Sequence, residues 1–252
     1  VYDDYAAADM ALQMGKKDDY KYFARRADFY KNLFDKSTNF MRPRLSTGEW
    51  KSPFNPSALA HAESDGGDYT EGNAWQYTWH VQHDVPGLIQ LFGGSKPFIA
   101  KLDSFFTTKL NSTLCDVTGL IGQYAHGNDP SHHVAYLYPY AGEQWKTAEK
   151  VRYIQDVFYT DQPEGVIGNE DCGQMSAWHI MSALGFYQVN PSNGVFVFGS
   201  PLFPKATVRL ENGKTFEVVA EGNSKENIYI QSATLNGQPY DKSYILYEDI
   251  MK

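Results

Sequence analysis

The change of pattern that decides the fold lies in residues 168–200, which have the sequence GNEDCGQMSAWHIMSALGFYQVNPSNGVFVFGS. After Asp171, apolar residues recur at the spacing of a helix with one buried face. These residues are Met175, Trp178, Met181 and Leu184. From about Gln188 the helical spacing is lost, and short β-rich runs such as VFVFG begin. The sequence therefore predicts a helical portion of residues 1–188, followed by a small β region of residues 189–252.

Several helical patterns precede this stretch. The opening residues, VYDDYAAADMALQMG, already have one. A second helix is expected between an N-cap at Asp18 and a stop at Pro43, and its apolar residues are Phe23, Ala27, Tyr30 and Phe34. Three more helices are expected: from about Pro86 to Gly93, from about Ser95, and over residues 143–159. The apolar stripe of the last is Trp145, Ala148, Val151, Ile154 and Val157.

The β-rich runs predict antiparallel pairing. ATVRL and TFEVVA are separated by residues 211–214, and Asn236-Gly237 follows the run NIYIQSATL. An Asn-Gly pair between apolar runs is the strongest short signal of a β-hairpin. We therefore expect a small antiparallel sheet, in a fold that is otherwise mainly α.

The composition argues against several classes of function. The 252 residues carry 22 Lys and Arg against 30 Asp and Glu, a net charge of −8. This balance argues against nucleic acid or an anionic membrane as a partner, and no apolar run approaches the ~20 residues that span a bilayer. Because the chain opens within a helical pattern, we expect a fragment, whose lack of a signal peptide says little about location. We expect Cys115 and Cys172 to be buried thiols rather than a disulfide.

Polar residues that could carry chemistry concentrate in loops between the expected helices. These loops are residues 69–88, 122–138 and 168–178, and their carboxylates are Glu71, Asp84, Asp129, Glu170 and Asp171. No G-x-S-x-G elbow, H-E-x-x-H zinc motif or phosphate-binding glycine loop is present in the sequence. Two interpretations remain: paired-carboxylate catalysis, as in glycoside hydrolysis, and a helical scaffold whose acids cap helices. Asp84 before Pro86 fits the second role.

Three motifs resemble signatures of glycoside hydrolase family 92, the calcium-dependent exo-α-mannosidases common in Bacteroidetes. They are TEGNAWQYTW (70–79), HGNDPSHHVAYLY (126–138) and GNEDCGQMSAWHIMSALGFYQV (168–189), in the order of the family. The resemblance continues through GSPLF (199–203) and covers essentially the whole chain. Family members are longer, with a β-sandwich domain followed by an (α/α)6 toroid. The resemblance thus implies a mainly α fold: part of an (α/α)6 toroid, followed by a small antiparallel β region.

The resemblance implies an inverting mechanism, in which one acid protonates the leaving oxygen and another activates water. Glu71 matches the general acid of the family, and Asp171 matches the general base. Some members carry an acid where this chain has Asn169, whose amide cannot accept a proton from water. Because inverting glycosidases hold their two carboxyl groups roughly 6.5–9.5 Å apart, we expect Glu71 and Asp171 to face one cleft at such a separation.

The resemblance also implies a Ca²⁺ ion that engages sugar hydroxyls. The corresponding ligands are Glu149, Asn128 and Gln76, which all offer the oxygen atoms that a hard cation requires. The candidate substrate-binding residues are Trp75, Asn128, Asp129, His132, His133, Asn169 and Glu170. Many members that act on α-1,2 links have Glu where this chain has Asp129. The expected α-1,2 preference therefore rests on a motif that is one methylene shorter here.

The resemblance further implies the substrate, partner and location. The substrate is an α-mannoside oligosaccharide of the N-glycan or mannan type, and the parent protein is secreted, periplasmic or on the cell surface. The expected partner is a missing N-terminal β-sandwich domain of the same protein, without which the isolated chain is expected to fold but lack activity. The alternative function is a non-catalytic carbohydrate-binding or scaffold fragment.

Overall fold

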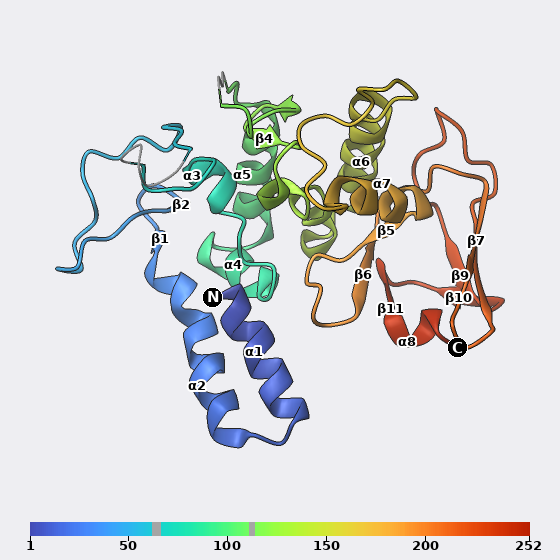
Figure 1. The fold of residues 1–252 in the computed structure, drawn as a ribbon, viewed down its shortest axis with the longest axis horizontal. Helices are drawn as coiled ribbons and strands as arrows, with labels where there is room; N and C mark the ends of the chain where they lie inside the picture. The colour runs from blue at the N-terminus through green and yellow to red at the C-terminus, as the bar shows by residue number, and fades with distance from the viewer. Residues whose placement is uncertain (62–66, 111–113) are drawn as a thin grey trace. The chain divides into compact units, whose positions relative to one another are not determined.

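The computed structural model of the chain describes residues 1–61, 67–110 and 114–252. It divides into two compact units, Val1–Ser131 and His132–Lys252, and Figure 1 traces their helices and strands in chain order. The expected division into residues 1–188 and 189–252 stays a prediction. No helix in the described ranges is both long enough and apolar enough to cross a membrane.

The first unit is mainly helical. Its helices are α1 (Tyr2–Gln13), α2 (Lys17–Ala27), the 3-10 helix η1 (Asp28–Asn32), α3 (Ala74–Tyr77), α4 (Val85–Leu91), α5 (Ser95–Thr107) and the 3-10 helix η3 (Asp129–Ser131). Two short antiparallel pairs are β1 (Phe34–Asp35) with β2 (Phe40–Met41), and β3 (Leu120–Ile121) with β4 (Tyr124–Ala125). Figure 1 shows α1 and α2 side by side as a helical hairpin.

The helix expected between Asp18 and Pro43 ends early. α2 starts at Lys17, which places Asp18 in the first turn rather than at the N-cap, and α2 ends at Ala27 before η1 and the β1–β2 pair. Tyr30 is nevertheless buried, and its hydroxyl donates to Asp84 Oδ2 at 2.7 Å. Tertiary contacts of this kind outweigh local helical spacing. The apolar pattern thus predicts the burial of Tyr30 but not the end of the helix.

The helices on either side of Gly93-Gly94 are confirmed, and they supply much of the core of the first unit. Asp84 is the N-cap of α4, where its carboxylate accepts from Gly87 N–H at 2.9 Å. The core residues that are almost fully buried include Trp79, Leu88, Phe98, Leu102 and Phe105. Burial of a large apolar side chain contributes about 1.5–3 kcal/mol, so this cluster holds the loops that leave α4 and α5.

The second unit begins with helices, and strands make up most of its C-terminal part. Its helices are the 3-10 helices η4 (Val134–Tyr136) and η5 (Tyr138–Ala141), then α6 (Gln144–Phe158), α7 (Gln174–Leu184) and α8 (Tyr247–Ile250). Its strands are β5 (Phe186–Tyr187), β6 (Val195–Phe198), β7 (Lys205–Arg209), β8 (Thr215–Val219), β9 (Ala233–Leu235), β10 (Gln238–Tyr240) and β11 (Tyr244–Leu246). They pair antiparallel in the orders β11–β6–β5, β7–β8 and β9–β10, so the β region holds three small sheets.

The hairpin signals are confirmed. β9 and β10 are joined by Asn236-Gly237, whose φ angles are 50° and 78°. A type I′ turn requires positive φ at both central positions, which Asn and Gly adopt most easily. β7 and β8 also form a hairpin, joined by the longer loop of residues 210–214, in which Gly213 has a φ of 81°.

Two predictions of side-chain burial are wrong. Trp145 and Val157, at the two ends of the α6 stripe, are 48% and 46% exposed, while the middle of the stripe is buried. Cys115 and Cys172 are free thiols as expected, but both are exposed. They lie in loops rather than on the inner face of a helix or strand, so nothing covers them as a core would.

Candidate active site

Glu71 lies in the loop before α3, on left-handed backbone. Its φ is 52°, a conformation that costs about 1–3 kcal/mol in a residue other than glycine. Hydrogen bonds on both sides hold it: Glu71 N–H donates to the His61 carbonyl at 2.9 Å, and Gly72 pairs with Ala60. Asn128 Nδ2 donates to the Glu71 carbonyl at 3.0 Å. The backbone of the candidate acid is therefore fixed, while its side chain remains partly exposed.

Asn73 and Gln76 form a capping box that starts α3. Asn73 Oδ1 accepts from Gln76 N–H at 3.3 Å, and Gln76 Oε1 accepts from Asn73 N–H at 3.0 Å. Gln76 Nε2 also donates to the Gln123 carbonyl, and Asn73 Nδ2 donates to Gln123 Oε1, both at 3.0 Å. These buried bonds attach the TEGNAWQ motif to the segment that leads to Asn128. They also engage both polar ends of the Gln76 side chain.

Trp75 lies against Lys101, a residue that belongs to none of the three motifs. Lys101 Nζ is 4.2 Å from the centroid of the Trp75 ring and 3.2 Å from that of Phe40. Burial lowers the pKa of Lys101 to about 8. Sequence reasoning missed Lys101, although it follows the buried Phe98 by three residues and so lies at the edge of the apolar face of α5.

The HGND segment lies beside Glu71 within the first unit. Asn128 is buried, whereas Asp129 is exposed at the start of η3. His80 Nε2 lies 3.1 Å from the Pro130 carbonyl, and burial lowers the pKa of His80. The predicted residues Glu71, Trp75, Gln76 and Asn128 are thus brought together through α3 and its partners, with Asp129 adjacent to them in sequence.

In the second unit, the paired histidines are buried beside α7. His132 and His133 are only 2% and 4% exposed. His132 Nδ1 lies 3.0 Å from Gln174 Nε2, and the His132 carbonyl accepts from Trp178 Nε1 at 3.0 Å. Because Gln174 and Trp178 belong to α7, the HH pair is fixed to the helix that follows the GNEDCG loop.

The GNEDCG loop separates its two acids. The Glu170 carboxylate accepts from the N–H groups of Gly173 and Ser176, the second at 3.1 Å, and chiefly the Ser176 bond lowers the pKa of Glu170. Glu170 thereby caps the start of α7. Asp171 has a φ of 52° and is exposed, and no hydrogen bond to its carboxylate is found among the described residues. Asn169 is exposed beside them.

Glu149 lies on α6 and contacts the loop before β9. Its Oε1 accepts from the Tyr229 hydroxyl at 2.7 Å, a bond that raises the pKa of Tyr229. Within the described part of the second unit, this hydrogen bond is to the β region rather than to the GNEDCG loop.

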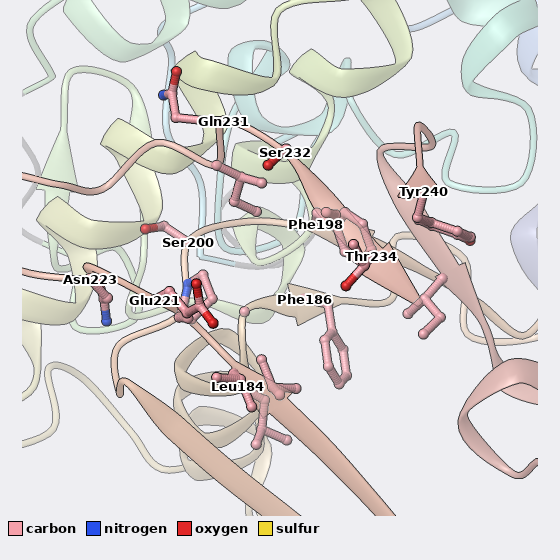
Figure 2. Close-up of a pocket in the computed structure, with 18 of the residues that line it drawn as sticks. Leu184, Phe186, Phe198, Ser200, Glu221, Asn223, Gln231, Ser232, Thr234 and Tyr240 are labelled. Carbon is pink, nitrogen blue, oxygen red and sulfur yellow. The ribbon is translucent and has the colours of Figure 1, made fainter. Parts of the chain in front are cut away.

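The second unit also has a cavity of about 630 Å³, which is not lined by residues of the GNEDCG loop. Figure 2 shows it between aromatic residues such as Phe186 and Phe198 and polar residues such as Asn223. No candidate catalytic or metal-binding residue of this unit lines it. One of its acids, Glu217, is paired with Lys205 at 2.9 Å. The cavity therefore holds none of the acids that the sequence motifs assign to sugar cleavage.

Comparison with known proteins now shows the family of the chain. The sequence profile of the glycosyl hydrolase family 92 catalytic domain matches residues 1–252. The chain belongs to glycosyl hydrolase family 92. It is 45% identical, with a TM-score of 0.94, to a family 92 α-mannosidase of Bacteroides thetaiotaomicron in complex with mannoimidazole. This match covers 99% of this chain and 33% of that one.

Two further relatives agree with this membership. An inverting mannosidase of the same family, also from Bacteroides thetaiotaomicron, is 37% identical with a TM-score of 0.86, over 99% of this chain and 34% of that one. An uncharacterized secreted glycosidase of the fungus Arthroderma benhamiae is 30% identical over 98% of this chain and 33% of its own length. The family 92 chain thus spans about a third of each relative. The predicted class, mainly α with part of the family's (α/α)6 toroid and a small antiparallel β region, is confirmed.

Proposed function

We propose that this family 92 chain is the part of an inverting exo-α-mannosidase that carries both catalytic acids. Family membership and the likeness to an α-mannosidase support the reaction class. The assignment of Asp171 as the general base rests on the different environments of the two acids in the GNEDCG loop. Glu170 is engaged in capping α7, whereas the neighbouring Asp171 is exposed and its carboxylate is not used by the fold.

In the proposed reaction, water attacks the anomeric carbon from the face opposite the leaving group. Asp171 takes a proton from the attacking water, and Glu71 gives its proton to the glycosidic oxygen as that bond breaks. Mannose leaves as the β anomer, and solvent restores the two protonation states. The left-handed backbone at both acids supports this assignment, since strained residues cluster at functional sites.

The substrate-binding proposal follows from exposure. Asp129 and Asn169 are exposed, so they can hydrogen-bond sugar hydroxyls directly. His132 and His133 are buried. We propose that they support sugar binding indirectly, by fixing the residues that line the sugar pocket. Trp75 offers an aromatic surface to a sugar ring. The proposed substrates are α-1,2-linked mannosides of N-glycans or mannans.

The candidate calcium ligands fit a hard cation unequally. Asn128 uses its amide nitrogen to bond Glu71, which leaves its amide oxygen as donor, and Glu149 has a second carboxylate oxygen beside the one that bonds Tyr229. Gln76 Oε1 already accepts a backbone N–H. We therefore propose Asn128 and Glu149 as ligands and assign Gln76 mainly to capping α3. Bound calcium would orient sugar hydroxyls and favour distortion of the ring.

The remainder of the proposal concerns the whole protein. Because the chain spans about a third of its relatives, we propose that an N-terminal β-sandwich domain completes the sugar pocket. A secreted, periplasmic or surface location is supported by the secreted relative.

The test is hydrolysis of aryl α-mannoside and α-1,2-mannobiose by the full-length protein beside the 252-residue chain. The proposal expects mannose release by the full-length protein, loss in EDTA and recovery with Ca²⁺, with no measurable release by the chain alone. α-1,3- and α-1,6-mannobiose serve as linkage controls. Inactivity of the full-length protein on every α-mannoside would contradict the proposal.

A further inference from the structure

A second group of chemically reactive side chains lies in the first unit, outside the residues assigned to sugar cleavage. His61, Cys115 and Asp116 come from two loop segments, and their ligand atoms all lie within 4.8 Å of one another. His61 Nδ1 is 2.8 Å from Asp116 Oδ2. The Cys115 thiol donates to the same oxygen at 3.4 Å. One nitrogen, one sulfur and one oxygen thus lie close together.

These nitrogen, sulfur and oxygen ligands favour a transition metal over calcium. Imidazole, thiolate and carboxylate together are typical of Zn²⁺, which binds them at about 2.0–2.3 Å in tetrahedral geometry. Tetrahedral bonds of that length place neighbouring ligand atoms about 3.3–3.5 Å apart. The Cys115–Asp116 distance already matches this spacing, and the His61–Asp116 distance needs to open by about half an ångström. Calcium is disfavoured, because it takes oxygen ligands.

The two segments are held together without a metal. Leu59 lies two residues before His61, while Leu114 and Val117 flank the Cys115-Asp116 pair. All three belong to one hydrophobic cluster with Leu110 and Ala125. A site built on such a cluster is largely formed before an ion arrives, which reduces the entropy that binding costs. His61 is 50% exposed and Asp116 16%, so an ion can enter from solvent.

We propose that His61, Cys115 and Asp116 form a zinc site with a fourth position open to water. The same site would brace the candidate acid, because the His61 carbonyl accepts the Glu71 N–H at 2.9 Å. The zinc ion of this site is a different metal from the proposed calcium ion. The zinc site can exist whether or not the protein has mannosidase activity. Ligand binding requires loss of the thiol proton, so affinity rises with pH.

The test uses the full-length protein, stripped of metal and titrated with Co²⁺ as a spectroscopic stand-in for zinc. A thiolate bound to Co²⁺ produces a charge-transfer absorption, which calcium sites lack. We expect one Co²⁺ per chain with this band, displaced by Zn²⁺. Cys115→Ser removes the band, and His61→Gln and Asp116→Asn each weaken binding at least about tenfold.

Cys172→Ser is the matched control, because Cys172 is the other exposed free thiol. It leaves the band unchanged. A band that survives Cys115→Ser, a band lost in Cys172→Ser, or no cobalt binding by the unaltered protein would each overturn the proposal. Since His61 and Cys115 are exposed, we expect the variants to melt as the parent protein does in the absence of metal, so loss of the band reports the site and not the fold.

Discussion

At the residue scale, the two neighbouring acids of the GNEDCG loop have different environments, and substitution separates them. Asp171→Asn in the full-length protein is expected to lower kcat by about 10²–10⁴-fold, because an amide cannot take a proton from water. The melting temperature should be nearly unchanged, since the fold does not use the exposed Asp171 carboxylate. Asp156→Asn, an exposed acid on α6, is the control and should retain activity. Loss of folding together with activity would refute the catalytic role.

Glu71 has a test of its own, because a general acid matters most for a poor leaving group. Glu71→Gln should reduce hydrolysis of α-1,2-mannobiose by about 10²–10⁴-fold. It should reduce hydrolysis of dinitrophenyl α-mannoside far less, because that leaving group departs without a proton. Steady-state kinetics on the two substrates measure the difference. Equal losses on both would argue that Glu71 positions the sugar rather than protonating it.

Lys101 provides a test of the hydrophobic surroundings of Trp75. Its pKa is about 8 in the fold against an ordinary value of 10.5, so between these pH values the unfolded chain binds more protons. Stability therefore rises with pH across this window, and the penalty for the charged amine is fully present below about pH 8. Thermal melts should show that the effect of Lys101→Met on stability becomes less favourable from pH 7.5 to 10. Lys96→Met, an exposed lysine of the same helix, should show no such change; an equal pH dependence in both would contradict the burial argument.

How far the sequence predicts the site also depends on the residue. Glu71 and Asp171 can be proposed from motif and chemistry alone. The division between Glu170 and Asp171 cannot, because adjacent acids differ only once the loop geometry decides which one meets the N–H groups of Gly173 and Ser176. Lys101 is missed because cation–π contacts with Phe40 and Trp75 join three separate segments.

At the scale of single elements, α7 depends on the Glu170 cap. Hydrogen bonds, chiefly from Ser176, lower the pKa of Glu170 below its ordinary value of 4.5. The cap therefore contributes stability above that value and loses it as pH falls through the lowered pKa. Glu170→Gln should reduce the melting temperature at pH 7 and lessen its decline on acidification. Glu164→Gln, an exposed acid nearby in sequence, is the control; identical acid curves for all three proteins would contradict the capping role.

Elements with local start and stop signals are predicted well. α4 has Asp84 before it and Gly93-Gly94 after it, and the β9–β10 hairpin has Asn-Gly at its turn. α2 is predicted badly, because its end at Ala27 is decided by tertiary packing of η1 and the β1–β2 pair. Periodicity reports which side chains are buried, but it does not report where a chain changes direction.

At the scale of the whole molecule, the chain divides into two compact units, and the predicted division at residue 188 stays a prediction. The first unit ends at Ser131, between Asp129 and His132 of one motif. Such a boundary cannot be predicted from spacing, because it depends on which helices pack together. Each unit carries one candidate acid. The central claim is that Glu71 and Asp171 act in a single reaction.

The most direct measurement is the configuration of the first product. The full-length protein is mixed with an aryl α-mannoside, and the anomeric proton of released mannose is followed by NMR before mutarotation. An acid and a base that act on opposite faces of the sugar must release β-mannose first. Loss of this signal in Asp171→Asn would agree with the account, whereas initial release of α-mannose would contradict it.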